Sequence, residues 1–219
     1  MAIKEKRLFK HPKNVKNALK VLEATINTLN SNNIEYYLDF GTLIGAVREK
    51  AFIPWDDDMD ISLVNEDDYQ KIPQLLKEIK DSGFRTYLLS FSHTIEKRKA
   101  AALRRNTKAK VNGISFTDIN STRVAKIRNN KVYKFGRGGS TLDIFCKYEK
   151  DNELHWMAQG KTHAVSADLL KDGLEEIDFY HLKCKIPKNF DAYLSSMYGD
   201  WKTPKVDWQY YNHDTCTTC

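Results

Sequence analysis

Residues 37–63 read YLDFGTLIGAVREKAFIPWDDDMDISL, and the rest of the chain is organised around them. They contain a short apolar segment, a Gly-Thr pair, a segment with helical spacing, a Pro-Trp pair and then four aspartates within five residues. Carboxylates this close together repel one another and destabilise a fold unless a cation lies among them. The stretch therefore predicts a cation-binding site.

The aspartates open a predicted strand. From Asp58 to Val64, polar and apolar residues alternate, which is the period of a strand with one buried face. Asp58 and Asp60 then project from the same face. The residues expected to face the core are Met59, Ile61 and Leu63. Two carboxylates on one strand face suit a pair of divalent ions such as Mg²⁺ or Mn²⁺, which prefer oxygen ligands.

A site of this kind usually needs a further carboxylate from a neighbouring strand. The segment STLDIFCKY, residues 140–148, carries one at Asp143 among β-branched and aromatic residues. An acid in such a strand is expensive to bury without a partner. Asp143 is therefore the predicted third carboxylate.

A second feature precedes the aspartates. Residues 34–40 are predicted as a strand that Gly41 and Thr42 close, directly before the helical spacing of TLIGAVRE. A strand, a glycine turn and a helix N-terminus present free backbone N–H groups and a positive dipole end to an anion. This order predicts a phosphate cradle opposite the metal ions.

Together these residues resemble the signature of the LicD family, the phosphocholine-type transferases that include the fukutin-related proteins, within the nucleotidyltransferase superfamily. The resemblance continues through VAKIRN (124–129), TLDIF (141–145) and IPKNFDAYLSSMYGDWKTP (186–204), so it covers most of the chain from about residue 14 to 204. Glu49 stands where the family usually has His, and Ala51 where it usually has Gly. The resemblance implies an α/β (α+β) fold, a nucleotidyltransferase-like mixed sheet flanked by helices, with a C-terminal helical extension.

The function that the resemblance implies is a metal-dependent transfer of a phosphorylated alcohol, such as phosphocholine. The donor would be CDP-linked, the acceptor a hydroxyl of a glycan or lipid-linked oligosaccharide, and CMP would be released. Asp58 and Asp60 would bind the ions, and Asp143 would complete the metal site or act as base towards the acceptor. Asp56 would be a further metal or water ligand, while Asp57 would make structural hydrogen bonds.

A second group would hold the diphosphate of the donor: Gly41, Thr42, Arg48, Lys126 and Arg128. Lys126 and Arg128 alternate on one face of a predicted strand. Exposed basic residues on an edge strand are as common as ligands. The resemblance at Lys126 favours the ligand interpretation.

The chain is predicted to form a single domain over residues 1–219, because its length suits one α/β domain and no repeat or long low-complexity linker divides it. The core is expected over about 14–150 and the C-terminal part over about 151–204, with a flexible tail over 205–219. Periodicity and turn residues predict the remaining elements. These are helices over 14–30, 66–82 with an interruption at Pro73, and 189–198; strands over 84–91 and within 111–148; and a hairpin over 175–187.

Composition bounds the location and the partners. No run of about 18 apolar residues is present and the first residues lack an apolar segment, so we expect no transmembrane helix, no secretory signal and a cytoplasmic location. The net charge is +6, and KRKAAALRRNTKAK, from Lys97 to Lys110, is basic without an acidic residue. Such a run is either a solvated surface or an attraction to an anionic partner, including peripheral contact with the inner face of the membrane.

Two other functions compete with the transferase. The first is nucleotidyl transfer, which would leave NMP on the product, for example by cytidylyl transfer to a phosphate or phosphonate. The second is nucleic-acid binding, which rests on the basic run, leaves the aspartates unexplained and is supported by no nucleic-acid motif. We therefore expect no nucleic-acid partner.

Two other metal sites are also considered. Asp56, Asp58 and Asp60 match positions 1, 3 and 5 of a calcium-binding EF-hand loop, but Ile61 stands where that loop needs Gly. A zinc site at the C-terminus would lack a second ligand pair; its ligands would be His213, Cys216 and Cys219. In a cytoplasmic chain the four cysteines are expected as reduced thiols.

Overall fold

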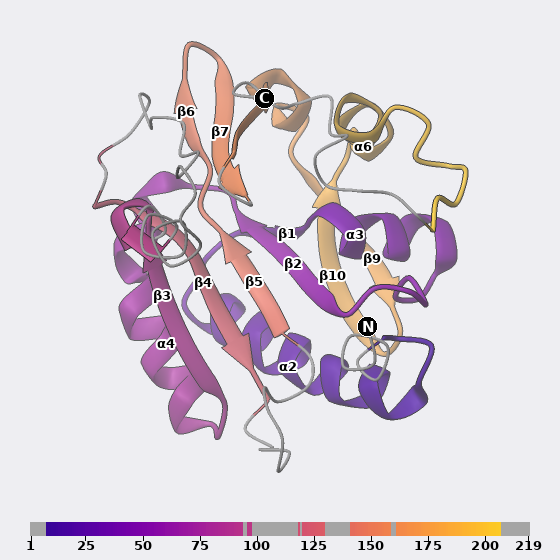
Figure 1. The fold of residues 1–219 in the computed structure, drawn as a ribbon, viewed down its shortest axis with the longest axis horizontal. Coiled ribbons are helices and arrows are strands. Elements are labelled where there is room, and N and C mark those ends of the chain that lie inside the picture. The colour runs from indigo at the N-terminus through magenta and orange to yellow at the C-terminus, as the bar shows by residue number, and fades with distance from the viewer. Residues whose placement is uncertain are drawn as a thin grey trace, which may run out of the picture.

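A five-stranded sheet forms the centre of the computed structural model, which describes residues 8–93, 96–97, 118, 120–129, 141–158 and 161–206 (Figure 1). The strand order is β1-β2-β5-β4-β3, with β2 and β5 parallel and the other neighbours antiparallel. The strands are β1 (Tyr36–Leu38), β2 (Asp58–Leu63), β3 (Arg85–Ser90), β4 (Thr122–Arg128) and β5 (Thr141–Phe145). Because β5 enters between β2 and β4, two strands far apart in the sequence become neighbours.

Two helices, α2 (Pro12–Ser31) and α4 (Ile72–Asp81), lie side by side on one face of this sheet (Figure 1). The apolar stripe predicted for residues 14–30 is confirmed. Its buried members in α2 include Ala18, Leu22, Ile26 and Leu29. The predicted core-facing residues of β2 are each at most 2% exposed: Met59, Ile61 and Leu63. This packing leaves the opposite face of β2 to the aspartates.

The helix predicted over 66–82 is divided near Pro73. A 3-10 segment, η2 (Glu66–Lys71), precedes α4, and Pro73 stands in the first turn of α4. A proline is tolerated there because the N–H it lacks would have no partner inside the helix. The interruption at Pro73 is confirmed.

The connection from β1 to β2 holds a short helix, α3 (Phe40–Ile44), followed by a π-helical segment, η1 (Gly45–Glu49). A Cβ at Gly45 would lie 2.6 Å from the carbonyl oxygen of Ala51, so glycine lets the chain fold back closely. The predicted strand over 34–40 is shorter than expected, because α3 already begins at Phe40.

The C-terminal part adds two small antiparallel sheets and a helix. The first sheet holds β6 (Tyr148–Lys150), β7 (Glu153–Ala158) and β8 (Lys161–Ser166), and the second β9 (Leu174–Phe179) and β10 (Leu182–Pro187). A 3-10 turn, η3 (Ala167–Leu170), joins them, and α6 (Phe190–Tyr198) follows. The hairpin over 175–187 and the helix over 189–198 are confirmed, whereas most of the extension before α6 is strand.

Several predictions lie outside the described residues. These are most of the basic run, from 98 to 110, the strand before 118, the turn over 136–139, the tail from 207 and its candidate zinc ligands. Cys146 and Cys184, which are described, are buried free thiols. None of the described helices is both long enough and apolar enough to span a bilayer.

Candidate active site

The predicted carboxylates meet on neighbouring strands. Asp60 of β2 pairs in register with Asp143 of β5, and Asp143 pairs in turn with Lys126 of β4. Residues that pair directly across strands project from the same face of a sheet, and so does Asp58, two positions before Asp60. The placement of Asp143 beside the aspartate strand is therefore as the sequence predicted.

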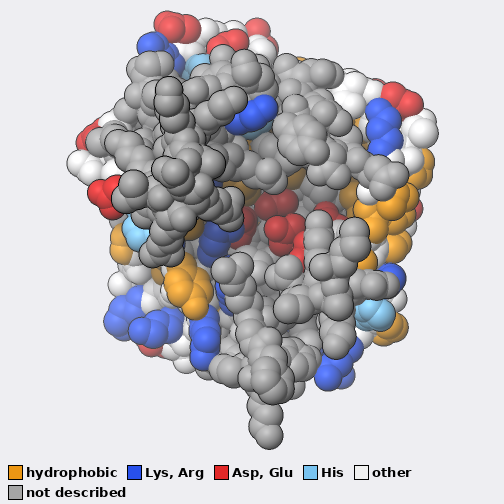
Figure 2. Space-filling view, viewed as in Figure 1, with side chains coloured by type: hydrophobic (Ala, Val, Ile, Leu, Met, Phe, Trp, Pro, Cys, Tyr) orange, Lys and Arg blue, Asp and Glu red, His pale blue; other side chains and the backbone are white. Residues whose placement is uncertain are grey.

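This row of residues lies in a cleft of about 530 Å³. Figure 2 shows acidic side chains gathered in a hollow of this face, with basic side chains nearby. The predicted residues that line the cleft are Gly41, Arg48, Asp56, Asp58, Asp60, Lys126 and Asp143. Asp57 and several aromatic residues line it as well, among them Phe40, Trp55, Tyr198 and Trp201.

The carboxylates crowd one another. One carboxylate oxygen from each of Asp56, Asp57 and Asp58 lies within 4.8 Å of the others, and the Asp57 N–H donates to Asp56 Oδ1 over 2.9 Å. Burial raises the pKa of Asp58 and of Asp60 well above the usual range, and the charges of the neighbouring aspartates, Asp143 among them, raise it further. Burial also raises the pKa of Asp56.

Little positive charge offsets these acids. Lys126 Nζ forms an ion pair with Asp143 Oδ2, but no basic side chain among the described residues pairs with Asp58 or Asp60. Asp143 Oδ1 is buried and accepts no hydrogen bond from the part of the chain that the structure describes. A cluster of carboxylate oxygens that carries more negative than positive charge can supply the oxygen ligands of a divalent cation of the Mg²⁺ type.

Gly41 and Thr42 have different places. A Cβ at Gly41 would lie 2.5 Å from Asp56 Oδ2, so a side chain at this position of α3 would displace the Asp56 carboxylate. Thr42 is 2% exposed, and its Oγ1 accepts the N–H of Asp60 over 2.9 Å. Thr42 is not among the described residues that line the cleft, so it contacts the backbone of the acidic strand β2 from outside the cleft.

The basic residues also separate into two groups. Arg48 lies at the cleft, where its Nε donates to Glu49 Oε1 over 2.7 Å and its Nη1 to the carbonyl oxygen of Trp201 over 2.6 Å. Arg128 is absent from the described lining, and its guanidinium lies 5.6 Å from the ring centroid of Tyr87. Two cleft residues that the sequence analysis did not select are Arg123 and Lys205. No spacing in the sequence marks either of them.

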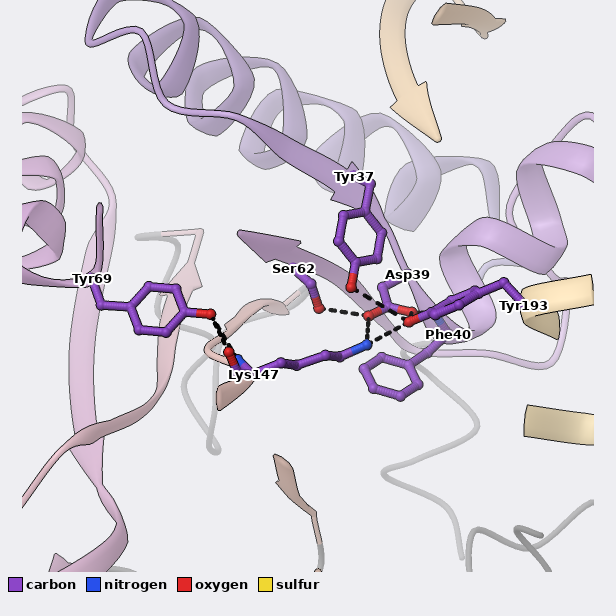
Figure 3. Close-up of polar contacts among 7 residues, drawn as sticks. All are labelled: Tyr37, Asp39, Phe40, Ser62, Tyr69, Lys147 and Tyr193. Carbon is purple, nitrogen blue, oxygen red and sulfur yellow. Dashed lines mark hydrogen bonds and ion pairs between the residues drawn. The ribbon is translucent and has the colours of Figure 1, made fainter. Parts of the chain in front are cut away.

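A second polar cluster, also not selected from the sequence, is buried beside the cleft (Figure 3). Its centre is an ion pair between Lys147 Nζ and Asp39 Oδ2, 2.6 Å apart, and both side chains are at most 1% exposed. Burial alone would lower the pKa of Lys147, but the charge of Asp39, together with hydrogen bonds to Asp39 and Tyr37, outweighs it and raises that pKa. One signal could have revealed the pair: Asp39 is an acid inside the apolar segment YYLDF and needs a partner there.

Comparison with known sequences gives a family match. A sequence profile described as the LicD/FKTN/FKRP nucleotidyltransferase domain matches residues 33–189. An uncharacterised protein of Rickettsia typhi is 41% identical over 66 residues, 30% of this chain and 21% of that protein. The lipopolysaccharide cholinephosphotransferase LicD of Haemophilus influenzae is 58% identical over 38 residues, 17% of this chain and 14% of that protein. The matches thus span less than a quarter of the length of either relative.

Solved structures show a more distant likeness. ANT(2″)-Ia in complex with adenylyl-2″-tobramycin aligns over 88% of this chain and 82% of its own, with 11% identity and a TM-score of 0.38. A solution structure of the antibiotic-resistance factor ANT(2″)-Ia aligns over 89% and 78%, with 12% identity and a TM-score of 0.41. Likeness at this level adds no argument to the family match.

Proposed function

The chain belongs to the LicD/FKTN/FKRP nucleotidyltransferase-domain family, and we propose that it is a metal-dependent transferase that moves a phosphorylated alcohol from a CDP-linked donor to a glycan hydroxyl. The observation that carries the proposal is the register of β2, β5 and β4, which brings Asp60, Asp143 and Lys126 into one row inside a cleft. This arrangement supports the proposal because it would place a cation beside a basic group, Lys126, that could contact phosphate.

The cation would be held by a group of carboxylates in which, among the described residues, Asp143 has a basic partner, Lys126, and Asp58 and Asp60 have none. Asp58 and Asp60 offer oxygens from one strand face, Asp56 from the preceding turn, and Asp143 from β5. A bound Mg²⁺ or Mn²⁺ would stabilise negative charge on the transferred phosphate and its leaving group. The buried Oδ1 of Asp143, which accepts no hydrogen bond from the described residues, could either bind this cation or receive the proton of the acceptor hydroxyl.

The donor diphosphate would lie between the acids and the basic side of the cleft. Arg48 and Lys126 would contact its oxygens through charge-assisted hydrogen bonds, and Gly41 lines the same cleft. The acceptor oxygen would bond to the distal phosphorus of the donor, and the phosphoanhydride bond to CMP would break. The products would be a glycan that carries the alcohol phosphate, and free CMP.

Mass spectrometry of the acceptor tests this assignment. The enzyme would be incubated with Mg²⁺, an oligosaccharide acceptor, and CDP-choline, CDP-ethanolamine, CDP-glycerol or CDP-ribitol in turn, with the Asp60→Asn variant as a blank. We expect one donor to add the mass of its alcohol phosphate to the glycan and to release CMP. An added CMP mass, or pyrophosphate release from CTP, would instead assign nucleotidyl transfer to the same site.

A further inference from the structure

The buried pair of Lys147 and Asp39 lies next to the acids but outside their cleft, and folding alone does not account for it. Taking two charges out of water costs more than their attraction usually returns, so apolar residues would stabilise the same position at least as well. The pair is also built from distant parts of the chain, since Lys147 follows β5 and Asp39 follows β1. Its neighbours indicate another role.

Asp39 uses its whole hydrogen-bonding capacity. Its Oδ1 accepts the N–H of Phe40 over 2.8 Å and the hydroxyl of Tyr193 over 2.9 Å. Its Oδ2 accepts the hydroxyl of Ser62 over 2.5 Å and Lys147 Nζ over 2.6 Å. A carboxylate offers about four acceptor positions, and a carboxamide, with one oxygen, cannot replace it here.

Lys147 is held as firmly as its partner (Figure 3). Its Nζ also donates to the hydroxyl of Tyr193 over 2.5 Å, and it lies 4.6 Å from the ring centroid of Trp156 and 4.8 Å from that of Phe40. The hydroxyl of Tyr69 binds the Lys147 backbone on both sides, donating to its carbonyl oxygen and accepting its N–H. Aromatic faces surround the ammonium group and Tyr69 fixes the backbone, so the Lys147 side chain is held in one position.

Asp39 connects this cation to the acidic strand. Its backbone N–H donates to the carbonyl oxygen of Asp60 over 3.0 Å, and Ser62, two residues further along β2, donates to its side chain. It also caps Phe40, which has a φ of 47°, in the left-handed region that a bulky residue rarely adopts. Phe40 leads directly into Gly41, which approaches Asp56, and then Thr42, which accepts the N–H of Asp60.

We propose that Lys147 is a positioning residue of the acidic site. By fixing the carboxylate of Asp39, it holds the left-handed turn at Phe40 and the middle of β2, and so sets where Asp56 and Asp60 present their oxygens. Tyr193 brings α6 into the same cluster, so the C-terminal part is tied to the geometry of the acids. The inference rests on the proposed function for the identity of the cation, but not for the contacts.

The experiment compares a single and a double variant of the full chain. Lys147→Met keeps most of the length of the side chain but leaves Asp39 charged and buried without its partner, so the thermal midpoint should fall by roughly 10 °C. Lys147→Met with Asp39→Asn removes both charges and should regain much of that midpoint. In both variants we expect Mn²⁺ binding, measured by calorimetry, to weaken at least about tenfold. In the single variant Lys147 no longer fixes the Asp39 carboxylate, and in the double variant an amide at position 39 cannot hold Phe40, Ser62 and Tyr193 together.

A matched control separates positioning from general destabilisation. Ile79→Ala removes buried apolar atoms from α4, on the opposite face of the sheet, and should lower the midpoint by a similar amount. Its Mn²⁺ affinity should stay within about twofold of wild type. Amide hydrogen exchange gives a readout that needs no metal: the N–H of Phe40 and of Asp60 should lose protection in the double variant and keep it in Ile79→Ala.

Each outcome either supports or overturns the positioning role of Lys147. If the double variant recovers stability and Mn²⁺ affinity together, the pair serves folding only and the proposal is wrong. If wild type binds no Mn²⁺, the proposed function fails, and the exchange of the Phe40 and Asp60 amides decides about Lys147 alone. If neither Lys147 variant folds, Lys147→Arg replaces them. Protection of the Asp60 N–H that is retained in Lys147→Arg supports positioning by the charge, and protection that is lost in Lys147→Arg but kept in Ile79→Ala would overturn it.

Discussion

The acidic cleft and the Asp39–Lys147 cluster share a face of one sheet, but their carboxylates differ in the partners that the chain provides for them. Asp39 receives a lysine and three further hydrogen-bond donors from the chain. Asp58 and Asp60 receive no basic partner among the described residues, and burial with neighbouring charge raises their pKa. The chain therefore compensates a carboxylate that supports structure and, within its described part, leaves without a basic partner two of those that we propose bind a cation.

The largest expected effect comes from the same substitution made in both regions. Asp60→Asn should lower turnover by roughly 10³-fold, because charge stabilisation is lost while the side-chain shape is kept. Without divalent cations its thermal midpoint should stay equal or rise, since a repulsive charge is removed. Asp39→Asn should instead destabilise the fold by about 3–5 kcal/mol, because Lys147 is left buried without a counter-charge.

Turnover assays and thermal unfolding in EDTA check both halves of this prediction. The proposed contrast between the two regions would be wrong if Asp60→Asn destabilised the metal-free protein as much as Asp39→Asn does. That result would mean that the cleft carboxylates are already compensated.

Adding the metal should sharpen the contrast. At a free Mn²⁺ concentration about 100 times the dissociation constant, binding stabilises the folded state by about 2.7 kcal/mol, which raises the thermal midpoint by roughly 5 to 10 °C. Asp58→Asn with Asp60→Asn should abolish this shift. A Mn²⁺ titration followed by differential scanning fluorimetry measures it, and an undiminished shift in the double variant would place the cation elsewhere.

The compensated region should respond to pH through His163. This residue of β8 is fully buried, its ring stacks on that of Trp156 at a centroid distance of 5.4 Å, and Trp156 lies under Lys147. Burial, aided by the charge of Lys161, lowers the pKa of His163 to about 4. The unfolded chain binds a proton near the usual pKa of 6.5 and the folded chain does not, so this contribution to stability is complete above pH 6.5 and is lost as the pH falls towards 4.

The expected loss from His163 is about 2 kcal/mol between pH 7 and pH 5. Denaturant unfolding at several pH values should show a flatter dependence for His163→Phe than for wild type. The variant His181→Gln changes an exposed histidine and should keep the wild-type slope. Equal slopes for His163→Phe and wild type would mean that folding does not lower the pKa of His163.

The smallest effect is expected at the basic side of the cleft. Arg48→Ala should raise the donor KM about tenfold with little change in kcat, because it removes a charge-assisted contact that exists before the transition state as well as in it. Arg128→Ala is the matched control, since Arg128 is not among the described residues that line the cleft. A fall in kcat at constant KM for Arg48→Ala would assign it to the leaving group instead.

The pattern of neighbouring residues in the sequence was enough to predict much of the fold and the placement of the acidic residues. The alternation after Asp58 predicted the buried and exposed faces of β2. Asp143 was predicted as a site residue because burying an acid in an apolar strand costs free energy unless it has a partner. The register that pairs Asp60 with Asp143 agrees with that expectation. These features depend on neighbours in sequence or on a strong cost of burial, which a single sequence reveals.

Features that depend on distant partners were not predictable in the same way. Lys147 stands in the polar segment KYEK, typical of an exposed strand end, and only its contact with Asp39 makes it a buried residue. Thr42 and Arg128 belong to the right segments for a phosphate site, but in the structure Thr42 faces β2 and Arg128 contacts Tyr87. Which side of a turn or strand a polar side chain takes is decided by tertiary packing.

The central place of β5 also orders events during synthesis. The acidic site needs β5 to insert beside β2, and the cluster behind it needs partners separated by 108 residues for Lys147 and Asp39 and by 154 for Tyr193 and Asp39. Contacts this distant form late, because the intervening chain must first be closed into a loop. A ribosome-bound chain that has not yet extruded α6 can therefore hold its aspartates close together but lacks the contact of Tyr193 with Asp39, so the proposed cation site would be complete only after α6 has emerged.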